Sequence, residues 1–207
     1  MYRVITLSIV SMILTTCVKA EEPRLQDYFP VAVGSKWHYR STTTVKSIKD
    51  FKTVDPLLLE VKQLETQNGD LIVQIKPDSG GVTETVILNS KGLFRTKTGA
   101  YTATPPLRLL RDPLKDGDSW KYTYEISILG GVPVSESATV TFEKCSVPAG
   151  DYDAVCVRRK LSFVLLNSTK QEIATWYSPR VGMIKQQIVT DDDVTAMLEL
   201  EKYEPAM

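Results

Sequence analysis

The chain has 207 residues, and its 25 Lys and Arg residues balance its 25 Asp and Glu residues. Binding to a phosphate backbone requires a surface with excess positive charge, so this balance excludes nucleic acid as an expected partner. It also gives no basis for electrostatic attachment to a membrane surface. The length is sufficient for one domain with a real hydrophobic core.

The N-terminus has the pattern of an export signal. Arg3 supplies a positive charge, and residues 4–18 form an apolar run. Val18 and Ala20 then place small or apolar residues at the −3 and −1 positions that signal peptidase recognises. We predict a signal peptide over residues 1–20 and a single β domain over residues 21–207. No other long apolar run follows, so no transmembrane segment is expected in the mature chain.

A competing interpretation of the same segment involves Cys17. Leu14-Thr15-Thr16-Cys17 loosely resembles a bacterial lipobox, in which the cysteine is lipidated and becomes the new N-terminus. The protein is therefore expected to be exported. It would be periplasmic or secreted in the first interpretation and lipid-anchored through Cys17 in the second.

Strand signals dominate the rest of the chain, because β-branched and aromatic residues recur between turn residues. Asn68-Gly69 predicts a type I′ hairpin, since both residues accept a positive φ. Short helices are expected at most near residues 22–28 and 106–111. Strands are expected over residues 37–48, 57–66, 71–76, 82–88, 93–95, 120–129, 132–147, 152–166, 172–177, 181–189 and 194–203. The predicted fold is an all-β antiparallel meander of about ten strands that forms a curved half-barrel or a sandwich.

Two motifs recur in the same order in the two halves of the chain. A G-x-x-W-x-Y motif occurs twice, at Gly34, Trp37 and Tyr39 and again at Gly117, Trp120 and Tyr122. A glycine followed by two apolar residues and a base also occurs twice, at Gly92-Leu93-Phe94-Arg95 and at Gly182-Met183-Ile184-Lys185. We therefore predict two pseudo-repeats, over about residues 28–98 and 112–190, joined by a proline-containing linker over about residues 99–116.

The G-x-x-W-x-Y motif is expected to be structural. Its glycine allows a turn into the strand, and its Trp and Tyr lie two residues apart, which places both rings on one face of the sheet. Both tryptophans should be buried where a strand begins. The alternative is an aromatic platform for a sugar or a lipid.

Two cysteines remain after the predicted cleavage, Cys145 and Cys156, and we predict that they form a disulfide across a hairpin. In this scheme residues 139–147 and 152–163 are adjacent antiparallel strands, with both cysteines on the face opposite the apolar one. The scheme leaves Arg159 on the apolar face, which it does not explain. The alternative is a pair of buried free thiols.

Four stretches of the chain resemble the motifs of a group of exported bacterial proteins. The stretches are Tyr28-Phe29-Pro30 leading to Gly34-Ser35-Lys36-Trp37-His38-Tyr39, then Pro113-Leu114-Lys115-Asp116-Gly117-Asp118-Ser119-Trp120, then Val147-Pro148-Ala149-Gly150-Asp151-Tyr152, and Trp176-Tyr177-Ser178-Pro179-Arg180-Val181-Gly182-Met183-Ile184-Lys185. They are similar to the motifs of TapB-like proteins of the bacterial envelope, except that Arg180 replaces a common glycine. The resemblance implies an exported β-rich fold and no particular activity.

Residues suited to catalysis or metal binding are scarce. The chain has one histidine, His38, which the strand pattern places on the outside. One histidine and two cysteines do not make a zinc site, and the acidic clusters at Asp112/Asp116/Asp118 and Asp191-Asp192-Asp193 lack a calcium-binding spacing. We therefore expect no metal, no cofactor and no enzymatic activity.

The expected function is that of a non-enzymatic binding or interaction protein of the bacterial envelope. Its partner would be a hydrophobic small molecule, held on the apolar face of the curved sheet, or an envelope protein. The alternatives are an extracytoplasmic hydrolase with an unrecognised pair of carboxylates and a purely structural or assembly component.

Overall fold

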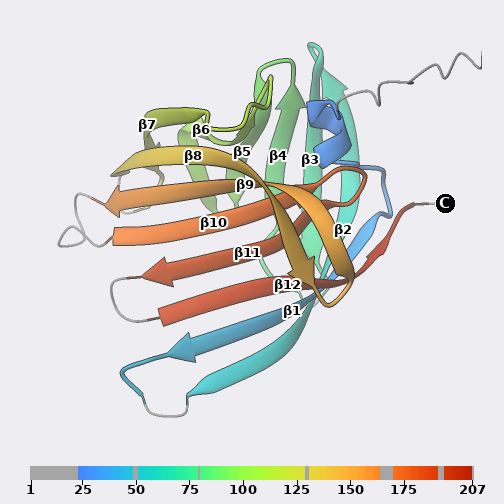
Figure 1. The fold of residues 1–207 in the computed structure, drawn as a ribbon. Coiled ribbons are helices and arrows are strands. Elements are labelled where there is room, and N and C mark those ends of the chain that lie inside the picture. Colours follow the sequence, from blue (N-terminus) through green and yellow to red (C-terminus); the bar gives the residue numbers. More distant parts are fainter. Residues whose placement is uncertain are drawn as a thin grey trace, which may run out of the picture.

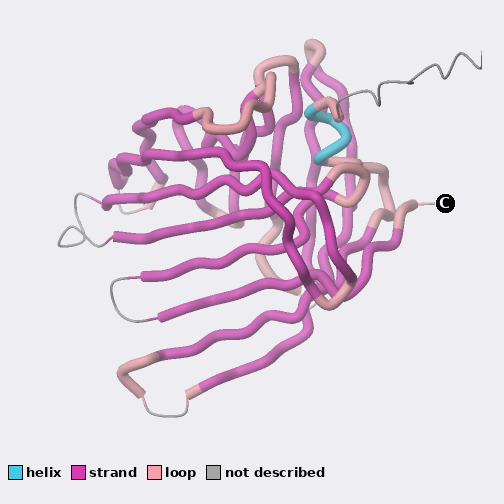
Figure 2. The backbone as a smooth tube through the Cα atoms, in the orientation of Figure 1, coloured by secondary structure: helices cyan, strands magenta, loops and turns pink. Residues whose placement is uncertain are grey.

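The computed structural model describes residues 23–48, 51–78, 80–128, 131–163, 170–190 and 194–206. These residues form a closed barrel of antiparallel strands in which each strand pairs with the next in sequence and the last pairs with the first (Figure 1). Strand makes up nearly all of the described chain (Figure 2). The elements are η1 (Leu25–Tyr28), β1 (Lys36–Val45), β2 (Lys52–Gln67), β3 (Asp70–Pro77), β4 (Glu84–Asn89), β5 (Gly92–Thr98), β6 (Tyr101–Arg111), β7 (Ser119–Ile126), β8 (Val132–Val147), β9 (Gly150–Phe163), β10 (Lys170–Ser178), β11 (Gly182–Thr190) and β12 (Val194–Glu204).

The predicted all-β antiparallel meander is confirmed, but its closure and strand count are not as expected. The sheet has twelve strands instead of about ten, and it closes into a barrel through pairing of β1 with β12, so it is neither a half-barrel nor a sandwich. Closure removes both free sheet edges, which an open sheet of this size would have to protect in some other way.

The missed strand is β6, which lies within the predicted linker of residues 99–116. Residues 106–111 are strand and not helix. Pro105 and Pro106 suggested a break, because proline cannot donate a backbone hydrogen bond. The barrel accommodates these prolines where β6 meets β7, a junction that we call the β6–β7 seam. Among the described residues the two strands pair there only through Ala103–Ile126 and Thr104–Glu125.

The core fills the inside of the barrel with side chains from both halves of the chain. Because successive side chains of a strand point to opposite faces, one alternate set from every strand enters this core. Its most buried aliphatic members are Val61, Val73, Val86, Leu93, Leu110, Val134, Val140, Val155, Val157, Ile184 and Leu200. At one end η1 packs against β10 and β11, with Leu25 and Tyr28 buried. The expected helix near residues 22–28 is thus a single 3-10 turn.

The two longest hairpins differ in what their tips contact. The β2–β3 turn at Asn68-Gly69 has φ values of 53° and 86°, as the predicted type I′ turn requires, and its tip is exposed. The β8–β9 hairpin instead crosses in front of β10 and β11 and reaches β12 (Figure 1), where Ala149 N–H donates to Leu200 O at 2.9 Å. The tip of this second hairpin is therefore held against the outer face of the barrel.

The repeated motifs occupy corresponding places in the two runs of six strands. Gly34 N–H donates to Val61 O and Val61 N–H donates to Ser35 O, at 2.9 and 3.0 Å. In the second half Gly117 and Asp118 make the same pair of bonds with Val140, at 3.0 and 2.9 Å. Trp37 and Trp120 are each the second residue of a strand, and both are buried. Gly92 and Gly182 each begin a strand, β5 and β11, with a positive φ.

The predicted signal peptide of residues 1–20 and the lipidation site at Cys17 lie outside the described residues. Within the described part of the chain, no helix has the length and hydrophobicity needed to span a membrane.

Candidate binding site in the barrel interior

The inside of the barrel contains two cavities, which we call the first and the second cavity. The first cavity, of about 230 Å³, is lined by Phe29, which follows η1, and by side chains from β1 to β6 and β10 to β12. The second cavity, of about 250 Å³, is lined mainly by β5, β6, β7, β9 and β10 and opens to solvent beside the exposed Lys97 and Tyr101. Arg95 belongs to the walls of both cavities, so the two adjoin at this side chain.

The first cavity has a mainly apolar wall. Three polar or charged side chains interrupt it, those of Glu84, Arg95 and Gln186. An apolar wall with a few convergent polar groups is the usual character of a small-molecule site. The apolar and aromatic lining residues are Phe29, Trp37, Tyr39, Leu57, Leu59, Ile75, Pro77, Val82, Val86, Leu93, Leu109, Tyr177, Met183 and Leu198.

The first G-x-x-W-x-Y motif builds one side of this cavity. Trp37 Nε1–H donates to Val181 O at 2.6 Å, and the Tyr39 hydroxyl donates to Met183 O at 2.6 Å. Burial raises the pKa of Tyr39, which stays protonated and able to donate. With their polar atoms bonded to the start of β11, the two rings serve both as core and as cavity wall.

The second copy of the motif does not line the first cavity. Trp120 is buried, and the half-buried Tyr122 donates from its hydroxyl to Pro106 O at 2.9 Å. This bond bridges the part of β6 that makes no ladder pairs with β7. Tyr122 therefore helps to close the seam left by the prolines.

Two ion pairs inside the barrel each place an arginine in the wall of a cavity. Glu84 and Arg95 approach to 3.3 Å and are partly exposed. Glu136 and Arg159 approach to 3.8 Å, with side chains only 0% and 3% exposed. A buried pair of this kind pays a large desolvation penalty and is weak evidence for stability, which points to a role beyond packing.

The Glu136–Arg159 pair has unused hydrogen-bonding capacity. Arg159 Nη1, Trp120 Nε1 and both carboxylate oxygens of Glu136 are buried without a hydrogen bond of normal geometry among the described residues, although Trp120 and Tyr124 face the carboxylate closely enough to lower its pKa. Burial raises the pKa of Glu136, although the charge of Arg159 opposes the shift. Buried polar groups are nearly always paired, and here Glu136 faces Arg159, Trp120 and Tyr124 in one buried polar cluster.

Of the Glu136–Arg159 pair, the sequence analysis singled out only Arg159. Arg159 falls on the apolar face of its strand, which the hairpin scheme left unexplained, and the structure shows that this face is the barrel interior. Glu136 gives the same signal, because alternation places it between Val134 and Ala138 on the inner face of β8. Two opposite charges on facing apolar surfaces of adjacent strands were therefore readable as a pair.

The predicted disulfide is wrong, because Cys145 and Cys156 are free and buried. A tight turn pairs Val147 with Gly150, so Cys145 lies opposite Tyr152. Cys156 lies four positions further along β9, or roughly 13 Å of strand, whereas a disulfide needs Cα atoms within about 7 Å. Burial raises the pKa of Cys156 to about 12 and that of Cys145 as well, so both thiols stay protonated.

The cysteines belong to a small cluster on the outer face of the barrel, centred on Trp176. Arg158 and Lys185 lie over its ring at 5.8 and 5.7 Å, and its Nε1–H donates to Glu143 Oε1 at 2.7 Å. Burial alone would raise the pKa of Glu143, but hydrogen bonds from Arg158 and Trp176 lower it. Trp176 thereby holds the β8–β9 hairpin on the outer face.

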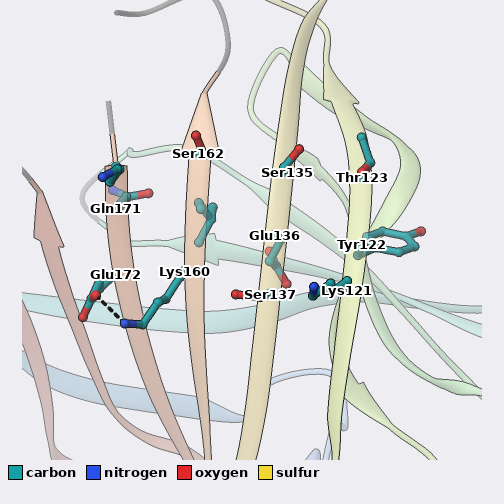
Figure 3. Close-up of a pocket in the computed structure, with 12 residues that line it drawn as sticks. Lys121, Tyr122, Thr123, Ser135, Glu136, Ser137, Lys160, Ser162, Gln171 and Glu172 are labelled. Carbon is teal, nitrogen blue, oxygen red and sulfur yellow. Dashed lines mark ion pairs between the residues drawn. The ribbon is translucent and has the colours of Figure 1, made fainter. Parts of the chain in front are cut away.

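A shallow groove of about 600 Å³ runs across the outer faces of β7 to β10 (Figure 3). Its outward side chains are short hydroxyl residues and exposed charges, such as Ser135, Ser162 and the Lys160–Glu172 pair at 3.1 Å. It offers little enclosure, so it is a weaker candidate for a small-molecule site than the interior cavities.

The remaining chemical candidates lie outside the barrel. His38 faces outward beside Glu204, at 3.3 Å. Asp116 accepts from Phe142 N–H at 2.8 Å, and Asp118 pairs with Arg111 at 3.4 Å. Asp191-Asp192-Asp193 lie outside the described residues. The described part of the chain contains no cluster of His, Cys, Asp and Glu suited to a metal ion.

Comparisons with known proteins identify the fold. No family model and no curated protein matches the chain. A crystal structure from Bacteroides fragilis, described as an exported protein with a YmcC-like fold, matches with a TM-score of 0.55 and 13% identity, over 84% of this chain and 96% of the other. A crystal structure from Parabacteroides distasonis, described as a lipoprotein, matches with a TM-score of 0.58 and 13% identity, over 89% and 100%. The chain therefore shares the YmcC-like β fold.

Proposed function

We propose that this protein is an exported, non-enzymatic binding protein that holds a small apolar molecule inside its barrel. The first cavity carries the proposal. An apolar cavity of 150 Å³ accommodates benzene, so a cavity of about 230 Å³ with aliphatic and aromatic walls has room for a somewhat larger ligand. The closed barrel moves the expected site from an open concave face to the interior.

The position of the reactive residues favours binding over catalysis. His38 is on the outer face, where it is engaged with Glu204, and does not line either cavity. Glu136, the interior carboxylate with a raised pKa, is engaged with Arg159. A glycosidase would need two carboxyl groups placed on either side of a substrate.

Export is proposed from the N-terminal pattern and the TapB-like resemblance, and it agrees with the exported and lipoprotein descriptions of the two similar structures. Mass spectrometry of the mature protein from a bacterial host tests it. A chain beginning at Glu21 supports a free periplasmic or secreted protein, and an acylated Cys17 supports a lipoprotein. An uncleaved chain starting at Met1 contradicts export.

Ligand binding is tested with the neutral fluorescent probe N-phenyl-1-naphthylamine. The wild-type protein should enhance its fluorescence in a saturable manner, because the probe enters an apolar environment. Leu57→Trp, which fills the first cavity, should abolish the saturable signal.

Leu58→Trp is the matched control. Leu58 neighbours Leu57 on β2 but pairs with His38 on the outer face, so this variant should bind like the wild type. Urea unfolding of both variants establishes that they are folded. Equal binding by both tryptophan variants, or no saturable signal in the wild type, would contradict an interior site.

A further inference from the structure

We propose that the second cavity takes the head of an anionic amphiphile, with a singly charged carboxylate against Arg159 and Arg95 and a short alkyl chain along the apolar wall. The inference goes beyond the proposed function, because it assigns a ligand class to the second cavity, whereas the first cavity carries the proposed function.

The second cavity presents positive charge without an acidic counterpart. Arg95, Lys97 and Arg159 line it, and no acidic side chain does so among the described residues. Glu84 and Glu136 lie behind the two arginines, as their ion-pair partners, and are not part of its wall. A cationic ligand would meet only like charges there, whereas an anion would be attracted.

One donor of this wall is built to receive a partner. The Arg159 side chain lines the cavity and is 3% exposed, and its Nη1 lies 3.8 Å from Glu136 Oε2, within ion-pair distance but beyond hydrogen-bond distance. A guanidinium matches the planar geometry of a carboxylate and forms short, charge-assisted hydrogen bonds with it. A carboxylate in the cavity would give this guanidinium hydrogen bonds that its pairing with Glu136 does not supply.

The rest of the wall suits a short alkyl chain. Aliphatic and aromatic side chains from β6, β7, β9 and β10 and from the segment after β7 line the space of about 250 Å³ beyond the arginines. These residues are Leu107, Ile126, Ile128, Leu161, Phe163 and Ile173. Burial of each methylene group adds roughly the same increment of affinity, so the wall rewards a linear apolar tail.

The charge balance favours a head with one negative charge over a head with two. Glu84 and Glu136 pair with Arg95 and Arg159, so each of the two guanidinium groups already has a carboxylate counterpart. Lys97 is then the one basic side chain of the wall for which the described residues show no carboxylate partner, and it leaves a single uncompensated positive charge. A carboxylate neutralises this charge, whereas a dianionic phosphate leaves a buried excess.

The experiment compares octanoate with 1-octanol, which share a chain and differ in the charge of the head. Both are titrated calorimetrically into wild-type protein, and we expect octanoate to bind at least about tenfold more tightly, since a hydrogen bond to a charged group contributes that much. Arg159→Met should remove this preference by weakening octanoate alone. Arg158→Met is the matched control, because Arg158 lies next to Arg159 but on the outer face, paired with Glu143.

A second variant keeps the test valid if Arg159→Met unfolds the protein by leaving Glu136 buried and unpaired. Glu136→Leu/Arg159→Met replaces the whole pair by apolar side chains, a change that is often tolerated. It should bind both ligands equally. Equal binding of both ligands by the wild type, or a preference for octanoate that survives in the double variant, overturns the head-group assignment and leaves interior binding intact. Binding of neither ligand, together with no probe binding, overturns the proposed function itself.

Discussion

The base that follows each repeated glycine takes opposite directions in the two halves of the barrel. Arg95 comes three residues after Gly92 and points into the interior, where it lines both cavities. Lys185 comes three residues after Gly182 and points outward, where it contacts Glu199 at 3.1 Å and lies over Trp176. The same local pattern thus places a base in the interior cavity wall in one half and on the outer face in the other.

The position of one β-bulge explains the difference. In β11 the extra residue is Ile184, since Trp176 pairs with Lys185 and Tyr177 pairs with Met183. In β5 the extra residue is Thr96, after Arg95. A bulge placed before the base moves it to the other face of the sheet, whereas a bulge placed after it does not. One displaced residue is sufficient to give the two halves different roles.

The turn glycines should show the largest difference between the halves. A Cβ at Gly92 would lie 2.2 Å from Leu110 O, and its φ is 150°. A Cβ at Gly182 would have no neighbour closer than 3.5 Å, with a φ of 89°. We expect Gly92→Ala to lower the free energy of unfolding by more than about 3 kcal/mol and Gly182→Ala by about 1–2 kcal/mol, measured by urea unfolding. Equal losses would show that the two turns are equivalent after all.

The tryptophans of the repeated motif should differ by less. Trp37→Phe removes the bond to Val181 O, whereas Trp120→Phe removes an Nε1–H that faces Glu136 without a hydrogen bond of normal geometry. Both changes lose similar ring area. The first should therefore cost about 1–2 kcal/mol more in unfolding free energy than the second. A larger loss for Trp120→Phe would reveal a partner for its Nε1 that the barrel does not show.

The β8–β9 hairpin should make stability depend on alkaline pH through Cys156. Its pKa is near 9 in an unfolded chain and about 12 in the folded protein. Between these values the unfolded chain releases a proton that the native protein keeps, so stability falls as pH rises, by at most about 1.4 kcal/mol per pH unit. Urea unfolding from pH 8 to pH 10.5 should show a shallower decline for Cys156→Ala than for the wild type.

The thiol state of the same hairpin can be measured directly. Denatured, unreduced protein that lacks residues 1–20 should yield two reactive thiols, and the native protein should react slowly because both cysteines are buried. Finding no reactive thiol after denaturation would restore the disulfide and with it a different register of β8 and β9.

The smallest expected effect on stability concerns Lys185, the base on the outer face of β11. Lys185→Met removes a partly exposed ion pair with Glu199 and a contact with the Trp176 ring, so a loss of about 0.5–1 kcal/mol is expected. Lys160→Met, which breaks a mostly exposed pair with Glu172, should change stability by less. Neither variant should affect binding of the neutral probe. Loss of probe binding in Lys185→Met would place its role inside the barrel.

The amino-acid sequence by itself determined the class of fold and much of its local structure. Period-two patterns predicted the all-β meander, Asn68-Gly69 predicted a tight hairpin, and the G-x-x-W-x-Y spacing placed two buried tryptophans at strand starts. These features depend on neighbouring residues in the chain, through side-chain alternation and permitted φ values. They are therefore readable from one sequence.

Only the tertiary structure decided how the strands close and which charges enter the core. Pairing of β1 with β12 and the seam of β6 with β7 depend on strands far apart in sequence or on prolines that a local pattern excludes. The four-residue error in the β8–β9 register and the opposite directions of Arg95 and Lys185 have a common physical reason. A turn length or a single bulged residue shifts every later side chain, and neither leaves a mark on hydrophobic periodicity.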